Sequence, residues 1–276
     1  MIPAPFEYEV AESPEQALQL LDQHGDEAKL LAGGHSLLPM MKIRLATPAM
    51  LVDIGRLSGL SYVRDEGDVL AIGPLTLHED LENNDLLQQH CRILAHTAGE
   101  IGDHQVRHRG TIGGSVVHGD PAADFPTVLL ALDAEFVLRS SSGERTVGAR
   151  DFSKGLFETE CGPTEMLTEI RVPKLNGSGW SYQKFHHRAQ DWAIVGVAAI
   201  ARNGSTSVAL TNMGEVPLRA EAVEQALASG SDAATASQEA DKNTSPPSDP
   251  FGSADYRKAM ARVLTRRALE EAQSGS

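Results

Sequence analysis

Two short segments of this 276-residue chain combine a pair of glycines with hydroxyl side chains: residues 32–36 read AGGHS and residues 111–115 read TIGGS. Adjacent glycines permit positive φ angles and let successive backbone N–H groups converge on a ligand with no side chain in the way. A Ser or Thr hydroxyl adds a further donor. This combination of residue types is suited to holding the oxygens of a phosphate.

The charge of the chain limits how a phosphate can be held. The 24 basic residues against 38 acidic ones give a formal net charge of −14, which disfavours nucleic acid and anionic membranes as partners. The second glycine pair is also far from any lysine, since Lys154 is the first lysine after Arg109. We therefore expect a phosphate ligand to be held mainly by backbone N–H groups and helix ends.

Neither glycine pair belongs to a common phosphate-binding fingerprint, because the chain lacks G-x-x-x-x-G-K-S/T and neither pair continues as G-x-G-x-x-G. One pair after a strand is most often a plain turn. Two pairs with the same chemistry, some eighty positions apart, are a stronger signal, because two loops can close on the two phosphates of one dinucleotide. Asp120 or Asp124 would then suit the hydroxyls of a ribose or ribityl chain.

The elements that must position these segments follow from the hydrophobic pattern. Residues 13–25 predict a helix that is capped by Ser13 and ended by Gly25, and short apolar strands on both sides make this a small α/β unit. From Gly59 onward, hairpins alternate with helices, which is an α+β pattern. We place a boundary near residues 173–179.

Beyond this boundary, the pattern predicts two or three strands, a short helix and a strongly amphipathic helix over residues 256–273. The polar tract of residues 229–254 is expected to be an exposed loop with at most a short helix. The whole chain is therefore assigned to the α+β class.

The remaining reactive residues follow no metal-binding pattern. Cys91 and Cys161 lack the spacing of a zinc or iron–sulfur site, and we expect two buried thiols rather than a disulfide. Four histidines near the glycine segments have irregular spacing, which predicts no metal site: His35, His104, His108 and His118. The chain has no run of 18 apolar residues and begins without a basic, apolar leader pattern, so we expect a cytoplasmic protein with no membrane span.

Four separated motifs resemble the FAD-binding medium subunit of the molybdenum hydroxylases, the family of carbon monoxide dehydrogenase and of the flavin region of xanthine dehydrogenase. They are AGGHSLLPMMKIR, RGTIGGSVVHGDPAADFP, YQKFHHRAQDWAIVGVAA and SADYRKAMARVLTRRAL. The resemblance implies a vanillyl-alcohol-oxidase-type (PCMH-type) FAD-binding domain over residues 1–177, with a small α/β lobe at about 1–57 and a larger α+β lobe at about 58–177. It also implies a C-terminal flavoprotein domain over residues 178–276, with a three-stranded antiparallel sheet and helices.

The resemblance further implies which residues contact FAD. Those expected around its pyrophosphate are Ala32, Gly33, Gly34, His35 and Ser36, together with Thr111, Ile112, Gly113, Gly114 and Ser115. Asp124 is expected near the sugar-like chain, Leu167 against the isoalloxazine ring, and Lys184 beside the ring, where a cation would stabilise negative charge. Without the resemblance, Lys184 would be interpreted as a solvated surface residue and Leu167 as a core residue. Many relatives have Asn at the position of Ser115. The Ser of this chain keeps a hydroxyl donor but lacks the amide.

The function implied by the resemblance is one step of an electron relay. FAD on this chain would take electrons from two iron–sulfur clusters of the 2Fe–2S type on a small subunit, while a large subunit carries molybdopterin and binds the organic substrate. The family assembles as a dimer of heterotrimers, and no residue of this chain is expected to be catalytic.

Two alternatives are a stand-alone FAD oxidase of the same superfamily and a nucleotide-binding regulatory module. The sequence leaves open the terminal acceptor and the substrate, which in relatives is carbon monoxide, an aldehyde, a purine or an N-heteroaromatic compound.

Overall fold

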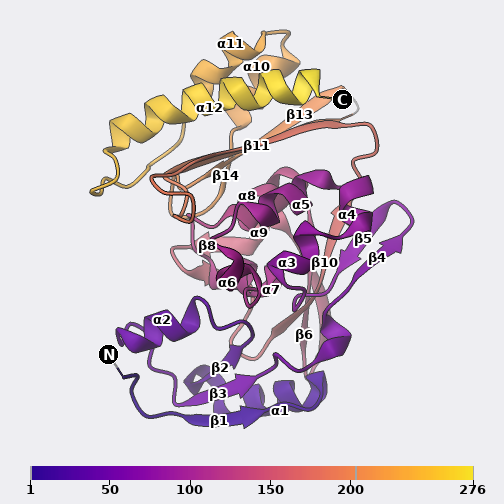
Figure 1. Cartoon of the computed structure of the whole chain (residues 1–276), viewed down its shortest axis with the longest axis vertical. Helices are drawn as coiled ribbons and strands as arrows, with labels where there is room; N and C mark the ends of the chain where they lie inside the picture. Colours follow the sequence, from indigo (N-terminus) through magenta and orange to yellow (C-terminus); the bar gives the residue numbers. More distant parts are fainter. Residues whose placement is uncertain (1, 203, 276) are drawn as a thin grey trace.

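The protein consists of three units stacked along its long axis (Figure 1). The computed structural model describes residues 2–202 and 204–275. The first unit holds the three N-terminal strands, which end at Asp53. The second holds the strands from Val63 to Pro173, and the third contains the C-terminal sheet and helices.

The N-terminal unit is a three-stranded parallel sheet in the order β1-β3-β2, with a helix after each of the first two strands. Its elements are β1 (Glu7–Val10), α1 (Pro14–His24), β2 (Ala28–Leu31), α2 (Leu37–Lys42) and β3 (Met50–Asp53). The Ser13 side chain accepts a hydrogen bond from the N–H of Gln16, and Gly25 ends the helix with φ of +52°. The helix predicted from its caps is therefore confirmed.

Parallel pairing explains where the first glycine segment points. Because β2 and β3 run in the same direction and pair Leu31 with Asp53, both strands end at one edge of the sheet. The chain that follows Leu31 leaves from this edge, where parallel sheets commonly bind ligands. Residues 32–36 therefore lie at the boundary with the second unit.

The second unit is built on a five-stranded antiparallel sheet in the order β4-β5-β10-β6-β7. The two hairpins predicted from the sequence are present, with β4 paired to β5 and β6 to β7. The strands are β4 (Val63–Glu66), β5 (Val69–Ile72), β6 (Glu135–Ser140), β7 (Gly143–Gly148) and β10 (Met166–Pro173). Strands β8 (Ser153–Gly155) and β9 (Glu158–Thr159) form a separate two-stranded sheet.

Seven helices accompany this sheet, and all of them except α6 contribute residues to one large apolar core that they share with it. They are α3 (His78–Glu82), α4 (Asp85–His90), α5 (Arg92–Gly99), α6 (His104–Arg107), α7 (Ile112–His118), α8 (Asp124–Ala131) and α9 (Ala149–Phe152). Helix α8 is buried along its entire length, because it lies between this core and the C-terminal sheet. It holds the second and third units together.

The C-terminal unit is an antiparallel sheet in the order β11-β12-β13-β14, covered by helices on its outer face (Figure 1). Its elements are β11 (Gly179–Phe185), β12 (Val195–Arg202), β13 (Ser205–Thr211), β14 (Leu218–Arg219), α10 (Glu221–Ala228), α11 (Ala233–Ala236) and α12 (Ala254–Ser274). The sheet has four strands rather than the three expected. Strand β14 is only two residues long, so it has no alternating pattern that would mark it as a strand.

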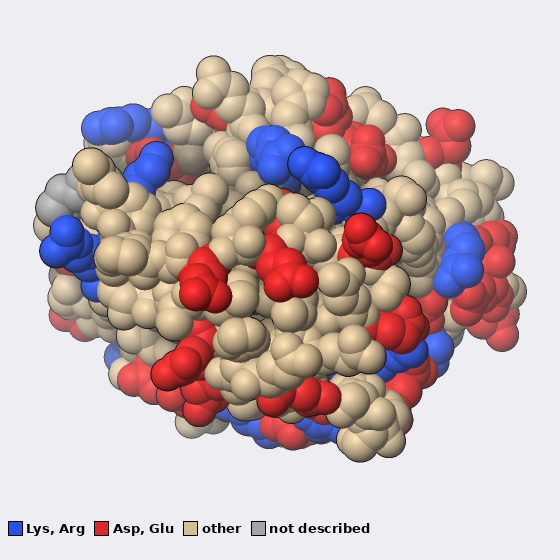
Figure 2. Space-filling view, turned by 90° about the horizontal axis from the view of Figure 1, so that it is seen from below, with Lys and Arg blue, Asp and Glu red and all other residues tan. Residues whose placement is uncertain are grey.

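Both cysteines are free thiols: Cys91 is buried and Cys161 is partly buried. No helix in the described part of the chain is long and apolar enough to cross a membrane. Figure 2 views the molecule from the side of the N-terminal unit and shows acidic and basic side chains interspersed on this face.

The contact between β11 and α12 predicts a stability effect. A Cβ atom at Gly179 would lie 1.7 Å from the carbonyl oxygen of Ala272, so Gly179→Ala must displace the helix. We expect a loss of about 1–3 kcal/mol in the free energy of unfolding, measured in urea. Gly148→Ala is the control, because no atom lies within 4 Å of a Cβ atom there. Equal free energies of unfolding for the two variants would contradict the close contact between Gly179 and the carbonyl of Ala272.

Candidate functional site

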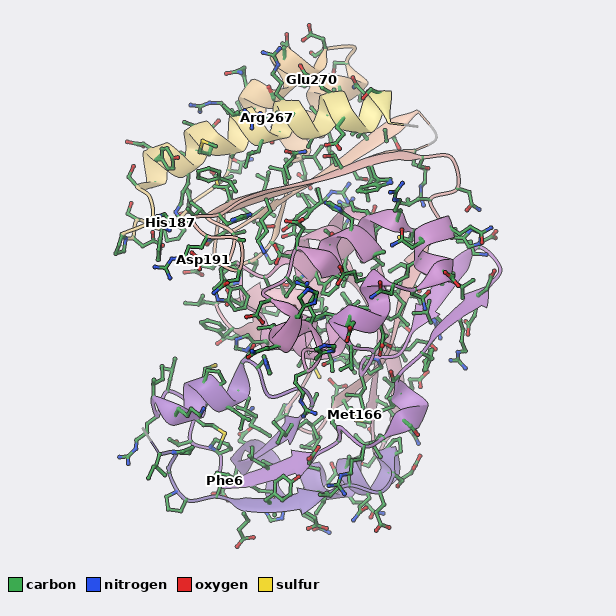
Figure 3. The ribbon with its side chains drawn as sticks, in the orientation of Figure 1. Phe6, Met166, His187, Asp191, Arg267 and Glu270 are labelled. Atoms are coloured by element: carbon green, nitrogen blue, oxygen red, sulfur yellow. The ribbon has the colours of Figure 1, made fainter. Side chains whose placement is uncertain are left out.

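A cavity of about 1420 Å³ lies where the three units meet. Drug-sized ligands occupy pockets of about 300–1,000 Å³, so this cavity has room for a longer molecule such as a dinucleotide. Its lining includes residues 32–37 from the first unit, 113–115 from the second and 190–192 from the third. Figure 3 shows two lining residues from different units, Met166 on β10 and Asp191 in the loop between β11 and β12.

All residues expected at the site line this cavity except Ile112. Ile112 is fully buried in the core of the second unit, because it is the first residue of α7 and faces the packed side of that helix. The structure therefore brings both glycine segments, Asp124, Leu167 and Lys184 to one cavity.

The first glycine segment meets the second at residues 109–110, which directly precede the second segment, so the contact between the two segments is made by backbone. A Cβ atom at Gly33 would lie 2.0 Å from the carbonyl oxygen of Arg109 and 3.1 Å from the Cα atom of Gly110. Only glycine fits this approach without a shift of one segment. The next residue, Gly34, has φ of +76°, a backbone conformation that is strained for residues with a side chain.

The first segment offers unpaired donors. Within the described residues, the backbone N–H groups of residues 33–36 donate no hydrogen bond to the protein. The carbonyls of Gly34 and Ser36 instead accept bonds from the start of helix α2. Four successive N–H groups at the edge of a cavity are able to donate hydrogen bonds to the oxygens of an anion.

The second segment is different, because it is the start of a helix rather than an open loop. The N–H groups of Ile112 and Gly113 donate to the carbonyls of Thr76 and Pro74. Those of Gly114 and Ser115 donate to the Thr111 side chain and carbonyl. The expectation that both segments present free N–H groups is thus corrected: the second contributes the N-terminal end of α7 and the hydroxyl-bearing residue Ser115, which lines the cavity.

The glycines of the second segment serve close packing. A Cβ atom at Gly113 would lie 2.4 Å from Cβ of Pro74, so this glycine lets α7 start against the preceding loop. At Gly114, the nearest atom to an added Cβ would be Oγ1 of the capping Thr111, at 2.8 Å. A side chain at Gly114 would therefore disturb the cap that begins the helix.

Lys184 and Asp124 form a buried ion pair in the cavity wall. Lys184 Nζ is 2.9 Å from Asp124 Oδ2 and donates to the Glu100 carbonyl at 2.8 Å. The side chains are 2% and 3% exposed, so the reading of Lys184 as a solvated surface residue is wrong. Tyr182 completes the group by donating from its hydroxyl to Asp124 Oδ1 at 2.5 Å.

Burial dominates the electrostatics of this group. It raises the pKa of the Asp124 carboxyl, although the positive charge of Lys184 and the hydrogen bond from Tyr182 act in the opposite direction. Burial also raises the pKa of Tyr182 well above its usual value, reinforced by the charge of Asp124. Since Asp124 faces the ammonium directly, the pair presents little net charge to a ligand in the cavity.

Several cavity residues carried no signal in the sequence analysis. His78, Lys154 and Trp192 all line the cavity, although they are far apart in the chain. His78 directly follows the residues LTL. A polar residue at such a position usually begins a helix at the surface, but the side chain of His78 is only 4% exposed. A histidine directly after an apolar stretch was the available clue.

Two family models match the chain in sequence order. The FAD binding domain in molybdopterin dehydrogenase matches residues 4–175, and the CO dehydrogenase flavoprotein C-terminal domain matches residues 180–272. The first match contains both glycine segments, and the second contains Lys184.

Similar proteins are known from several organisms. The chain is 42% identical to the medium chain of carbon monoxide dehydrogenase from Hydrogenophaga pseudoflava, over 99% of this chain and 98% of that one. It is 39% identical to the medium chain of glyceraldehyde dehydrogenase from Sulfolobus acidocaldarius, over 98% of this chain and 99% of that one. A solved structure of Hydrogenophaga pseudoflava carbon monoxide dehydrogenase without the Mo-pyranopterin moiety superposes with a TM-score of 0.96, at 43% identity and 99% coverage of both chains.

The buried ion pair predicts a specific pattern of stabilities. Lys184→Met is expected to destabilise the protein by about 3–5 kcal/mol, because the Asp124 carboxylate stays buried without its cation. In the double variant with Asp124→Asn, the neutral amide still accepts from Tyr182, so part of this loss is recovered. Urea unfolding of both variants measures the difference. Lys42→Met at an exposed position is the control, and a double variant no more stable than Lys184→Met would contradict the pairing.

Proposed function

This chain belongs to the FAD-binding medium subunits of the molybdenum hydroxylase family, and on that premise we propose that it carries FAD within a heteromeric complex. In this proposal, electrons reach the FAD from iron–sulfur clusters of a partner subunit and leave to a terminal acceptor. FAD suits such a position because it accepts electrons singly and releases them singly or as a pair. The protein's own residues bind it, orient it and limit its access to water.

The observation that carries this proposal is the contact between the two glycine segments at the edge of the cavity. Residues 33–36 have free N–H groups there, while α7 contributes Ser115, which lines the same cavity. The residues present therefore fit a diphosphate, because the donors are neutral and need no lysine. We assign the diphosphate of FAD to residues 32–36 and 111–115.

The remaining cavity residues fit the other parts of the molecule. Leu167 is 4% exposed and lines the cavity from β10, which suits an apolar contact with the flavin ring. Lys184 is held in place by Asp124 and by the Glu100 carbonyl, so its position is fixed before a ligand arrives. We assign Lys184 to the neighbourhood of the ring and Asp124 to the neighbourhood of the sugar-like chain.

The domain division and the assembly are part of the same proposal. Residues 1–177 are assigned to a vanillyl-alcohol-oxidase-type domain, with lobes at about 1–57 and 58–177, and residues 178–276 to the C-terminal domain. The partners are a large molybdopterin subunit and a small iron–sulfur subunit, assembled as a dimer of heterotrimers in the cytoplasm. The two cysteines of this chain are too few to ligate a cluster, which supports placing the clusters on a partner.

The organic substrate is assigned to the large subunit rather than to this chain. The medium chains of enzymes named for carbon monoxide and for glyceraldehyde are 42% and 39% identical to it. Sequence identity to this chain is therefore nearly the same for two enzymes that are named for different substrates. The alternative of a stand-alone FAD oxidase would need a substrate site next to the flavin on this chain. Both candidates require FAD, and the composition of the purified complex separates them.

The first functional prediction concerns the glycine contact. Gly33→Val and Gly114→Val are expected to abolish FAD binding, because the first forces the segments apart and the second disturbs the cap of α7. The measurement is flavin absorbance per protein chain after purification, with circular dichroism to verify folding. Gly148→Ala should keep full flavin content. Retained flavin in both valine variants would refute the placement of the diphosphate.

The second functional prediction concerns the assembly. Affinity purification of this chain from its source should yield two further subunits at a fixed ratio, with molybdenum, iron and FAD in stoichiometric amounts. Metal analysis and mass spectrometry of the purified material provide the test. Full substrate oxidation by the isolated chain with FAD alone would instead favour the stand-alone oxidase.

A further inference from the structure

A buried histidine lies beside the contact between the two glycine segments. His78 begins helix α3, is 4% exposed and lines the cavity. On one side its imidazole packs against the ring of Phe125, with the ring centroids 5.3 Å apart. On the other side lies Gly110, which itself touches Gly33. The residue therefore adjoins the place where the diphosphate is assigned.

The two nitrogens of this imidazole have different surroundings. Nδ1 is buried and has no hydrogen-bond partner among the residues that the structure describes. Nε2 lies on the side of Gly110, where a Cβ atom would be 2.7 Å away from it. Gly110 is also part of the cavity wall. Nε2 is thus the nitrogen that lies against Gly110, a residue of the cavity wall that also contacts Gly33.

Burial determines the charge and the tautomer of His78. It lowers the pKa of the imidazole to about 4, with smaller contributions from His35 and Arg107, so the ring is neutral near pH 7. A neutral imidazole has one N–H donor and one acceptor nitrogen. Because a buried N–H without an acceptor is more unfavourable than a bare lone pair, the proton belongs on Nε2.

We propose that His78 donates a hydrogen bond from Nε2–H to the diphosphate of the bound dinucleotide, an assignment that rests on the proposed function. The donor comes from a third segment of the chain, in addition to the N–H groups of residues 33–36 and the end of α7. A neutral donor suits this chain, whose net charge is −14 and whose buried lysine is already paired with Asp124. His78 would then contact the ligand at its charged centre rather than at the flavin ring.

The test compares two ligands in the complete protein, prepared with its partner subunits and freed of FAD. His78→Phe keeps a ring of similar shape without the donor, and His78→Gln can place an amide N–H near the position of Nε2. His78→Phe should weaken FAD binding by about tenfold or more, since hydrogen bonds to charged groups have this magnitude. Binding of riboflavin, which has no phosphate, should change by less than about twofold. His78→Gln should recover part of the FAD affinity.

The control is His96→Phe, because His96 packs against Trp180 and does not line the cavity. This variant should bind FAD like the unchanged protein. Equal losses for FAD and riboflavin in His78→Phe would mean that the residue only shapes the cavity, and would overturn the inference. Failure of the unchanged complex to bind FAD would overturn the proposed function itself.

A spectroscopic measurement tests the tautomer independently of affinity. In the FAD-loaded protein labelled with nitrogen-15 at histidine, His78 should show a protonated Nε2 and an unprotonated Nδ1 throughout the range from pH 6 to 8. The phosphorus-31 resonances of bound FAD should move in His78→Phe and return toward their original positions in His78→Gln. A protonated Nδ1, or phosphorus resonances that do not move, would contradict the assignment.

Discussion

The contact of Gly33 with the backbone of Arg109 and Gly110 is the constraint on which the site depends. At 2.0 Å from the Arg109 carbonyl oxygen, there is no space for a Cβ atom, so the N-terminal sheet can meet the second unit here only through glycine. The approach brings the free N–H groups of residues 33–36 to the same place as the start of α7. It brings two distant segments to the wall of one cavity.

A second set of contacts fixes the C-terminal unit on the other side of the cavity. Lys184 and Tyr182 on β11 both bond to Asp124 at the start of α8, and Thr211 on β13 pairs with Thr127 one turn further along at 2.8 Å. Because these groups are buried, separating the units would leave charges and hydroxyls unpaired. The loop that carries Asp191 is thereby held over the cavity.

The two glycine pairs look alike but have different physical roles. In the first pair, absence of side chains leaves the N–H groups of the backbone free for a ligand. In the second, it allows α7 to begin tightly against Pro74, with Thr111 as its cap. The cavity thus presents mainly neutral donors and a helix end, which is how a strongly acidic protein can hold an anionic cofactor without a cluster of lysines.

The sequence by itself determined the features that depend on neighbouring residues: the helix between Ser13 and Gly25, the hairpins of the second unit, the α+β class and the two segments that could hold a phosphate. The tertiary structure alone decided the burial of Lys184, the paired N–H groups of residues 112–115 and the position of His78. Each of these depends on atoms far along the chain: Lys184 finds its partner 60 positions away, and His78 faces Gly110. Patterns of hydrophobicity and capping encode local structure, whereas burial and hydrogen-bond partners arise only when distant segments pack together.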